Sequence, residues 1–258
     1  MEEVQDKLLE ESDYILEVER SIDISEGCSH IANLFFPKYY PELSSERIIT
    51  MDWLEGKHIK EFLKTSPWEE VKNKLGQAMW EFYHHQIHNL KQVHADPHPG
   101  NFLMQEDGLL GVIDFGCVKV IPEEFYEGYF MLMSKNLVDN DDELLPVLTE
   151  LSFLYEDDSE KDRAVFLSVF KEMTSLLGQP FHGDSFDFAD DEYFKKIYDL
   201  SERLSNMKEL RNSRHPRGSR HGLYINRTYY GLYTLLNELG AEVKTTKPEW
   251  LSAYAEAV

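Results

Sequence analysis

One short segment, residues 94–101 with the sequence HADPHPGN, constrains the fold of this chain more than any other feature. It contains two prolines and a glycine, so it cannot form a regular helix or a regular strand. Apolar residues at helical spacing precede it over residues 69–91, and a pattern typical of a β-hairpin follows it over residues 102–113. The sequence therefore predicts a polar loop between a helix and a hairpin, and the hairpin leads directly into Asp114-Phe115-Gly116.

Three oxygen-bearing side chains in this region have the types and the spacing that phosphoryl transfer requires. Asp96 precedes Asn101 by five residues, as in the protein-kinase loop H-R-D-x-x-x-x-N, and Asp114 heads a DFG triplet 13 residues after Asn101. The chemistry needs a carboxylate near the attacking hydroxyl and a few hard oxygen ligands for Mg²⁺. We therefore expect Asp96 to be the catalytic carboxylate, and Asn101 and Asp114 to bind a divalent metal.

The net charge decides which partners to expect. The 258-residue chain carries a formal charge of −22, which repels nucleic acid and disfavours general attachment to anionic lipid surfaces. We therefore expect no nucleic-acid partner.

The only cysteines are Cys28 and Cys117, without a CxxC pair, which indicates reduced thiols and a cytoplasmic protein. No apolar run approaches the roughly 20 residues that span a bilayer, so we expect no transmembrane segment and at most a peripheral membrane contact.

The order of the predicted elements indicates an α+β fold that is predominantly helical. Helices are predicted over residues 3–24 and 69–91, and from about residue 123 onward the chain reads as helices joined by acidic loops. Strand patterns are short: the β-branched run 47–51, which suits a buried strand, and the hairpin before Asp114. Such a chain can bury a sizeable core as one domain or as two unequal lobes.

These motifs resemble the AarF/UbiB family of atypical kinases, which is associated with coenzyme Q biosynthesis and isoprenoid-lipid metabolism. Residues 94–101 match the family's H-A-D-P-H-P-G-N loop letter for letter. Residues 11–17 are similar to its E-x-D-Y-x-x-E helix, and residues 37–44 and 49–56 resemble its stretch leading into the hinge. Asp52 stands where the family usually has Glu. The resemblance covers roughly residues 8–122 and is weaker over the helical tail.

The resemblance implies a protein-kinase-like fold that binds ATP or ADP with Mg²⁺ or Mn²⁺. It implies the same three loop residues as the spacing does, with Asp114 as principal metal ligand: Asp96, Asn101 and Asp114. It also implies that Glu17 pairs with a nucleotide-binding lysine, and that Glu11 and Asp13 lie near the nucleotide. Family members often act near membranes on lipid-related pathways, which implies a lipid or quinone-precursor ligand.

Other functions remain open beside this interpretation. His84 and His88 lie four residues apart on the predicted helix, and H-x-D-x-H in the loop resembles metal-hydrolase ligation, so a zinc or iron phosphohydrolase is one alternative. A small-molecule phosphotransferase of the aminoglycoside or choline kinase type uses a similar loop, although the E-x-D-Y-x-x-E helix and the intact Phe115-Gly116 argue against it. A pseudokinase or lipid-binding scaffold would keep the fold without turnover.

One segment near the C-terminus is basic, in contrast to the acidic rest of the chain. Arginines recur at every third position, and Pro216 and Gly218 predict a loop. These arginines are Arg211, Arg214, Arg217 and Arg220. We interpret this basic loop first as an ion-pair partner for the acids of the chain, and second as a contact for phosphate or anionic headgroups. The aromatic stretch 224–236 that follows predicts a helix packed into the core, with a lipid-binding face as the alternative that the family resemblance keeps open.

The resemblance also sets an expectation for domain organisation and activity. The family's lysine-glycine-glutamine motif, alanine-rich nucleotide loop and lysine-bearing strand are not found in this sequence. We expect residues 1–56 to be a remnant of the N-lobe, with the E-x-D helix, a strand and the hinge. Residues 57–258 would be the helical, kinase-like C-lobe with the catalytic loop and the DFG hairpin.

An incomplete N-lobe removes positioning and electrostatic stabilisation on which phosphoryl transfer depends. We therefore expect weak or no kinase activity from this chain by itself. A coupled ATPase assay with Mg²⁺ or Mn²⁺ tests this expectation. Robust turnover that Asp114→Ala abolishes would overturn it.

Overall fold

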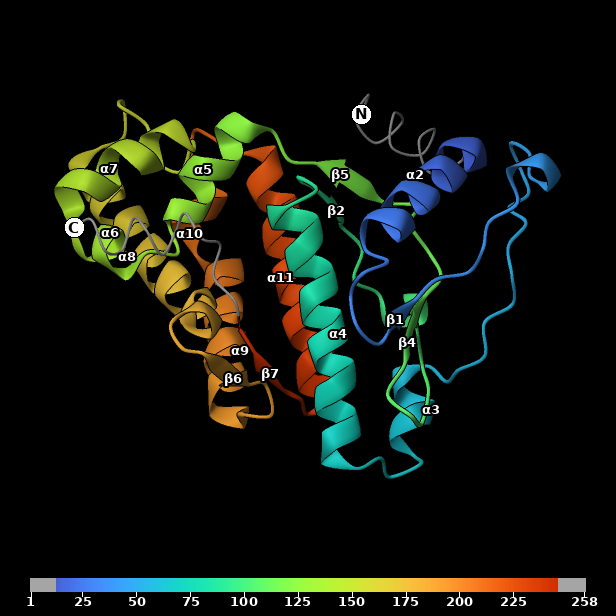
Figure 1. The fold of residues 1–258 in the computed structure, drawn as a ribbon. Coiled ribbons are helices and arrows are strands. Elements are labelled where there is room, and N and C mark those ends of the chain that lie inside the picture. Colours follow the sequence, from blue (N-terminus) through green and yellow to red (C-terminus); the bar gives the residue numbers. More distant parts are fainter. Residues whose placement is uncertain (1–12, 246–258) are drawn as a thin grey trace. The chain divides into compact units, whose positions relative to one another are not determined.

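Two long helices organise the computed structural model, which describes residues 13–245 (Figure 1). Helix α4 spans Glu69–His88 and helix α11 spans Arg220–Leu239. Contacts between residues divide the chain into two units. The described part of the first unit runs to Val120 and adds the segments Asp187–Ala189 and Arg227–Val243; the second comprises Ile121–Phe186, Asp190–Asn226 and the described residues from Lys244.

The first unit combines α4 and the second half of α11 with short helices and strands. Its other elements are α2 (Tyr14–Gly27), β1 (Leu34–Phe35), η1 (Pro41–Leu43), α3 (Ile59–Leu63), β2 (Gln92–His94), η2 (Pro99–Asn101), β3 (Phe102–Met104), β4 (Leu110–Val112) and β5 (Val118–Val120). Residues on both sides of the expected lobe boundary at residue 56 belong to this unit. The assignment of 1–56 and 57–258 to kinase lobes stays a prediction.

The predicted hairpin is confirmed. Strands β3 and β4 pair antiparallel, with Phe102 opposite Val112 and Met104 opposite Leu110. The turn between them contains Gly108 at φ +88°, a backbone conformation that favours glycine. Strand β1 adds to the other edge of β4 in parallel, which makes a three-stranded sheet. The hairpin therefore ends at Val112, two residues before Asp114.

The apolar periodicity of residues 69–91 produces helix α4, which the structure ends at His88. Its inward face is fully buried, and the Trp80 ring stacks on Tyr233 of α11 with ring centroids 6.4 Å apart. The predicted core packing of the aromatic stretch is confirmed for Tyr229, Leu232, Tyr233 and Leu236, whereas Tyr230 is 41% exposed. In Figure 1, α4 in teal and α11 in red accordingly run side by side.

The second unit is helical, as predicted from residue 123 onward. Its elements are α5 (Glu123–Met131), α6 (Lys135–Asp139), α7 (Asp141–Glu150), α8 (Glu160–Leu177), η3 (Gln179–Phe181), α9 (Asp191–Asn206) and α10 (Lys208–Arg211). Strands β6 (Ser185–Asp187) and β7 (Glu242–Lys244) contain residues of both units. Ser159 begins α8 by accepting a hydrogen bond from Asp162 N at 3.1 Å, and Asp190 begins α9 in the same way.

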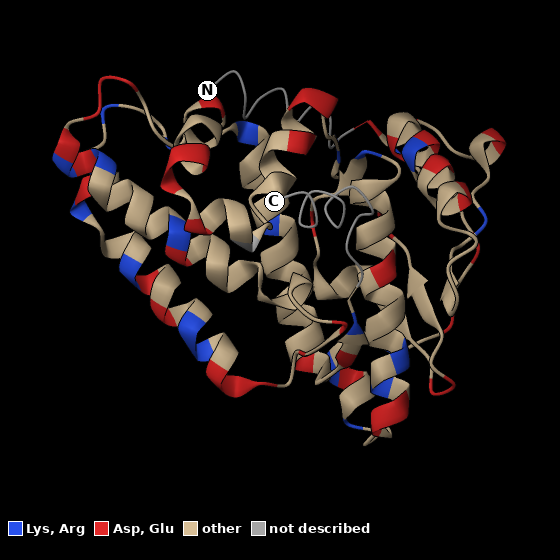
Figure 2. Cartoon of the chain, turned by 60° about the vertical axis from the view of Figure 1, so that its left-hand side comes forward, with Lys and Arg blue, Asp and Glu red and all other residues tan. Residues whose placement is uncertain are grey.

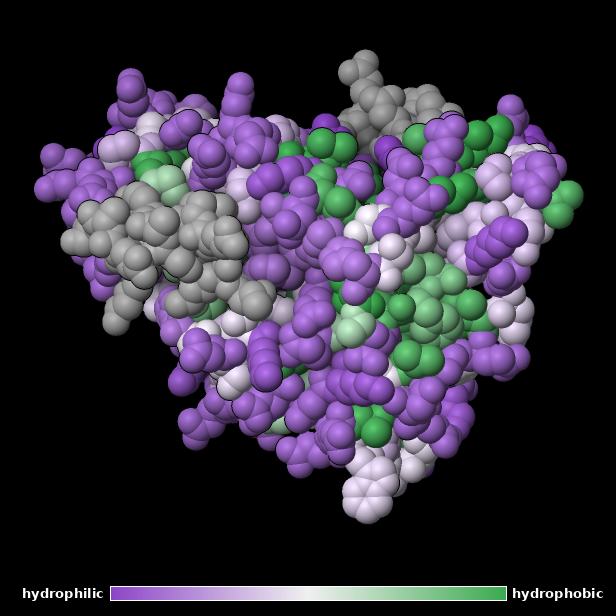
Figure 3. All heavy atoms as spheres, in the orientation of Figure 1, coloured by the Kyte–Doolittle hydropathy of each residue, from purple (hydrophilic) through white to green (hydrophobic). Residues whose placement is uncertain are grey.

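The surface is rich in charged residues, as the composition of the chain leads us to expect. Figure 2 shows acidic and basic residues interspersed along the helices. On the face drawn in Figure 3, hydrophilic residues predominate and hydrophobic residues gather only in small groups. Within residues 13–245, no helix has both the length and the apolar character that crossing a membrane requires.

One predicted strand is wrong. Residues 47–51 do not form a buried strand, because Ile48 is 60% exposed and only isolated bridges join Tyr39 to Met51 and Ser45 to Ile48. A tight turn closes between Ser45 and Ile48, where the Ser45 N–H donates to the Ile48 carbonyl at 2.8 Å. β-branched residues favour strands only where a pleated surface is packed against something. Here the turn directs the run toward solvent.

Two glycines inside helices give a matched test of the packing. A side chain at Gly76 of α4 would place its Cβ 2.5 Å from Ala241 Cβ, whereas at Gly128 of α5 the nearest atom, Leu151 Cδ2, would lie 3.8 Å away. We expect Gly76→Ala to lower the free energy of unfolding by about 1–3 kcal/mol through overpacking. Gly128→Ala should be neutral or stabilising by up to about 1 kcal/mol, since alanine favours helices. Urea unfolding measures both; equal effects would contradict this packing.

Candidate functional site

Strands β2 and β5 hold the two ends of the site together. They pair antiparallel, with His94 opposite Val118, and the Ala95 N–H extends the ladder by donating to the Cys117 carbonyl at 2.7 Å. The loop of residues 94–101 leaves β2 at this end, and the DFG triplet enters β5 at the same end. Asp96 and Asp114 are 18 residues apart in sequence, and this ladder brings their backbones to one edge.

Hydrogen bonds within the chain keep the irregular loop in place. Asn101 Nδ2 donates to the Asp96 carbonyl at 3.0 Å, and the His98 ring accepts a hydrogen bond from the Gly100 N–H at 3.0 Å. The Ile113 N–H donates to the Asn101 carbonyl at 3.1 Å, which ties the loop to the end of the hairpin. His98 therefore holds the loop backbone through its ring.

The DFG triplet is fixed on both sides of Asp114. The Phe115 ring is fully buried, with its centroid 5.8 Å from the His94 ring and 6.2 Å from the Phe82 ring. The Gly116 N–H donates to Asp114 Oδ1 at 2.8 Å. The aromatic anchor and this turn set the direction of the Asp114 carboxylate.

A cavity of about 540 Å³ opens over these residues. It is lined by Tyr14, Glu17, Ile49, His94, Asp96, Asp114, Gly116 and Cys117. Glu17 and Asp114 come close together beside Gly116, where an added Cβ would lie 3.6 Å from Glu17 Oε2 and 3.5 Å from Asp114 Oδ1. The structure therefore brings Glu17, Asp96 and Asp114 into one cavity, and their role in a nucleotide site stays a prediction.

Two carboxylates in this cavity, those of Glu17 and Asp114, repel each other. Burial, and next the negative charge of Asp114, raise the pKa of Glu17 to about 7. Burial lowers the pKa of His94 to about 4, against the opposing effect of Asp114 and Asp96, so His94 is neutral at neutral pH. Its Nδ1 atom is buried without a hydrogen-bond partner. A cation between Glu17 and Asp114 would relieve their repulsion.

The donor set fits a magnesium ion that is shared with phosphates. Mg²⁺ is usually held by one or two carboxylates, with substrate oxygens and water completing the octahedron. Asp114 carries one such carboxylate and lines the cavity, whereas Asn101 lies on the linked loop and is not among the residues that line it. In the part of the chain that the structure describes, no three His, Cys, Asp or Glu side chains form a ready-made metal cage.

The other two predicted nucleotide-site residues are Glu11 and Asp13. Asp13 lies at the start of α2, where its carboxylate accepts a hydrogen bond from the Leu16 N–H at 3.2 Å and caps the helix. It does not belong to the cavity lining. Glu11 lies outside the described residues. Nucleotide binding by Glu11 and Asp13 stays a prediction.

Sequence reasoning missed two residues of α11 that contact the loop. Arg227 Nη2 donates to Asp96 Oδ1 at 2.7 Å. Gly231, one turn later, packs its backbone on Pro97, since a Cβ there would lie 2.1 Å from Pro97 Cγ. The available signal was the four-residue spacing of an arginine and a glycine on one helix face. That spacing does not indicate which loop the face covers.

The histidines of α4 lie in the core. The His84 and His88 ring centroids are 4.3 Å apart, and the Tyr229 hydroxyl lies 3.3 Å from His88 Nε2. Burial, and next the neighbouring His85, lower the pKa of His84 to about 4. Burial also lowers the pKa of His88 well below its usual range. Both side chains are therefore neutral at neutral pH and pack as core residues.

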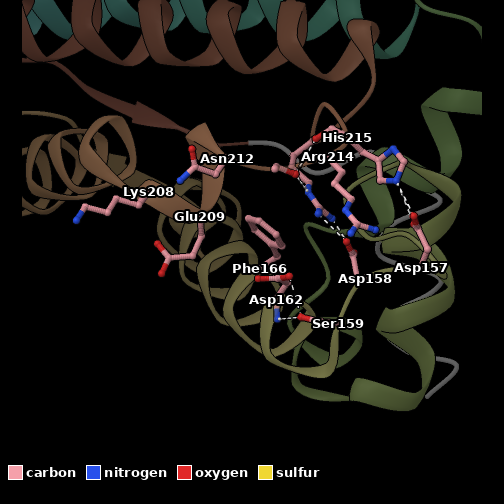
Figure 4. A pocket seen from close by; sticks show the side chains of 12 residues that line it. Asp157, Asp158, Ser159, Asp162, Phe166, Lys208, Glu209, Asn212, Arg214 and His215 are labelled. Atoms are coloured by element: carbon pink, nitrogen blue, oxygen red, sulfur yellow. Dashed lines mark hydrogen bonds and ion pairs between the residues drawn. The ribbon is translucent and has the colours of Figure 1, made fainter.

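The basic loop forms an internal ion pair through Arg217. Figure 4 shows this region, with Asp157, Asp158 and His215 labelled. Arg217 binds Asp158 through two N–H groups at 2.6 and 2.7 Å. The Arg217 guanidinium also stacks on the Phe166 ring at 3.9 Å, and both side chains of the ion pair are largely buried. His215 bonds Asp157 at 3.0 Å beside it. The interpretation of the loop as an ion-pair partner is confirmed for Arg217.

The fold of the chain has a counterpart among solved structures. The complex of Rv3197 with erythromycin from Mycobacterium tuberculosis matches with a TM-score of 0.69 and 22% identity, over 97% of this chain and 59% of that chain. This likeness concerns the fold alone. The fold and the site together define a kinase-like protein.

The chain belongs to the AarF/UbiB family of atypical kinases, because the model of the ABC1 atypical kinase-like domain matches residues 1–147. The mitochondrial atypical kinase COQ8 of Saccharomyces cerevisiae is 28% identical over 222 residues, which are 82% of this chain and 40% of that protein. An uncharacterized chloroplastic aarF domain-containing protein kinase of Arabidopsis thaliana is 32% identical over 136 residues, which are 52% of this chain and 18% of that protein. The chain thus spans less than half the length of either relative.

The raised pKa of Glu17 predicts how stability depends on pH in the protein without metal or nucleotide. Between pH 4.5 and about 7 the unfolded chain loses this proton while the folded chain keeps it, so stability falls as pH rises through that window. Glu17→Gln should remove this dependence. Above pH 7 it should stabilise the fold by on the order of 1 kcal/mol, after solvent screening is allowed for.

Urea unfolding in EDTA at pH 5 and pH 8 measures the effect. Glu19→Gln, on the same helix with an exposed side chain, is the matched control and should leave the pH dependence unchanged. An equal pH dependence in wild type and Glu17→Gln would contradict the crowding of Glu17 and Asp114.

Proposed function

We propose that this chain carries the site of an ATP-dependent phosphotransferase or ATPase of the atypical kinase class, that its 540 Å³ cavity binds ATP or ADP with Mg²⁺ or Mn²⁺, and that the chain by itself has weak or no turnover. The observation that supports this proposal is the convergence of three acidic side chains in one cavity: Glu17, Asp96 and Asp114. Acidic side chains that lie close together destabilise the folded protein. Such clusters occur at sites where a bound cation or a reaction needs them.

Each residue of the cluster has a role that follows from its surroundings. Asp114 and Asn101 would hold the metal ion, which, when bound, neutralises charge on the phosphates. Asp96 would orient the attacking hydroxyl or water and accept its proton. Glu17 would pair with a cation, which the family resemblance identifies as the nucleotide-binding lysine.

The family resemblance indicates a class of substrate and does not identify the substrate itself. The resemblance implies a role in quinone or isoprenoid-lipid metabolism, a lipid or quinone-precursor ligand and a peripheral membrane contact. The similarity to a protein named COQ8 supports this direction. A pseudokinase that binds nucleotide without turnover and a small-molecule phosphotransferase are alternatives that the experiment below separates.

Nucleotide binding is the first test. Mg²⁺ with ATP or ADP at about 100 times the dissociation constant should raise the melting temperature by about 5 °C, because ligand that binds only the folded state stabilises it. EDTA should reverse the shift, and Asp114→Ala should abolish it. Asp199→Ala removes an exposed carboxylate from α9 and should leave the shift intact.

Turnover separates the candidates. Phosphate release from ATP that Asp96→Asn and Asp114→Ala both abolish supports the enzyme, and a shift without turnover supports the pseudokinase. Phosphate transfer to aminoglycosides or choline would favour the small-molecule phosphotransferase. A wild-type chain whose melting temperature does not respond to Mg²⁺ and nucleotide would contradict the proposal.

A further inference from the structure

Helix α11 contacts the catalytic loop through its backbone. Gly231 lies so close to Pro97 that no side chain fits between them, because a Cβ would meet Pro97 Cγ at 2.1 Å and Pro97 Cβ at 3.0 Å. Pro97 directly follows Asp96, and proline restricts the backbone of the residue before it. The contact therefore sets the position of the backbone that carries the Asp96 carboxylate.

The same helix contacts the carboxylate itself. Arg227 lies one turn before Gly231, and its Nη2 atom donates to Asp96 Oδ1 at 2.7 Å. Within residues 13–245, the structure shows no other hydrogen bond to the side-chain oxygens of Asp96. Without this contact the carboxylate could rotate, since its second oxygen is not held.

Stability does not account for this ion pair. The side chain of Arg227 is 58% exposed and that of Asp96 is 44% exposed. Ion pairs that water reaches so freely contribute little to folding. An arginine that fixes one oxygen of a carboxylate contributes orientation instead, because its planar guanidinium forms directional hydrogen bonds.

The charge of Arg227 would also act on the reaction. The other charged side chains of the cavity, Glu17 and Asp114, are acidic like Asp96. The positive charge on Oδ1 offsets part of the negative charge that these three carboxylates bring together. Asp96 Oδ2 is then the oxygen that can accept a hydrogen bond from a hydroxyl.

We propose that Arg227 is a positioning residue that acts through Asp96, and that Gly231 sets the distance at which it acts. This inference rests on the proposed function. Arg227 holds Oδ1, so Oδ2 receives the proton of the attacking hydroxyl or water. The bond from the attacking oxygen to the γ-phosphorus forms as the bond from that phosphorus to the leaving ADP oxygen breaks. The proton then passes from Asp96 to solvent.

Binding of a transition-state mimic tests the proposal without depending on turnover. Aluminium fluoride with ADP and Mg²⁺ mimics a transferring phosphoryl group with water in line for attack. Arg227→Gln should weaken binding of this complex about tenfold, because orientation of the attacking group is lost. The same variant should leave the affinity for ADP with Mg²⁺ unchanged. Arg227→Lys, which keeps the charge but not the planar guanidinium, should restore only a small part of the loss.

Two comparisons show whether Arg227 acts through Asp96. In an Asp96→Asn background, Arg227→Gln should have no further effect, since the group that it orients is already changed. Arg203→Gln is the matched control: Arg203 is 55% exposed and pairs with Glu172 on another helix, in the second unit. It should bind both complexes as the wild type does, and all variants should melt at the wild-type temperature.

Gly231→Ala tests the backbone contact separately. Displacement of Pro97 should weaken the aluminium fluoride complex by a similar factor, whereas Gly128→Ala should not. If Gly231→Ala does not fold, the result with Arg227→Gln still decides the proposal.

The outcomes are distinct. If wild type binds ADP with Mg²⁺ and Arg227→Gln binds the aluminium fluoride complex equally well, the inference is wrong and the proposed function stands. If Arg227→Gln loses ADP affinity and melting temperature together, Arg227 is a structural residue and the inference is again wrong. If wild type binds no nucleotide, the proposed function fails and the inference fails with it.

Discussion

The pairing of β2 with β5 is the constraint on which the rest of the site depends. Between His94 at the end of β2 and the short helix η2, the loop forms no regular element, and prolines remove two backbone donors from residues 94–101. It is positioned because it begins where β2 ends, opposite the strand into which the DFG triplet leads. The Ala95 bond to Cys117 and the Asn101 bond to Ile113 close this frame on both sides. Asp96 and Asp114 face one cavity as a result.

This frame holds carboxylates close together although their negative charges repel each other. Glu17 is partly buried beside Asp114, and its raised pKa shows that the ionised form is disfavoured there. The same unit buries aromatic side chains of α4 and α11, and this burial offsets the cost of crowded carboxylates. The chain belongs to the AarF/UbiB family, and under the proposed function a bound metal ion would offset this crowding.

The sequence predicted much of this arrangement because several signals are local. The hairpin followed from a glycine turn between apolar runs, and α4 followed from apolar residues at helical spacing. The spacing of Asp96, Asn101 and Asp114 predicted a metal and nucleotide site, which stays a prediction; the structure places Asp96 and Asp114 in one cavity. The buried strand at residues 47–51 was wrong, because β-branched composition does not reveal that a turn exposes Ile48. Burial depends on what packs against a segment, which composition alone does not contain.

The sequence by itself determined which chemical groups are present and in what order: an irregular loop with a carboxylate and an amide, then a hairpin, then a second carboxylate. Only the tertiary structure decided what surrounds them. Arg227 is 131 residues from Asp96 in the chain, yet its guanidinium contacts that carboxylate because Gly231 lets α11 lie directly on Pro97. The crowding of Glu17 with Asp114 likewise arises from how α2 packs beside Gly116. Contacts between distant segments depend on the packing of whole elements, and no local pattern of residues encodes them.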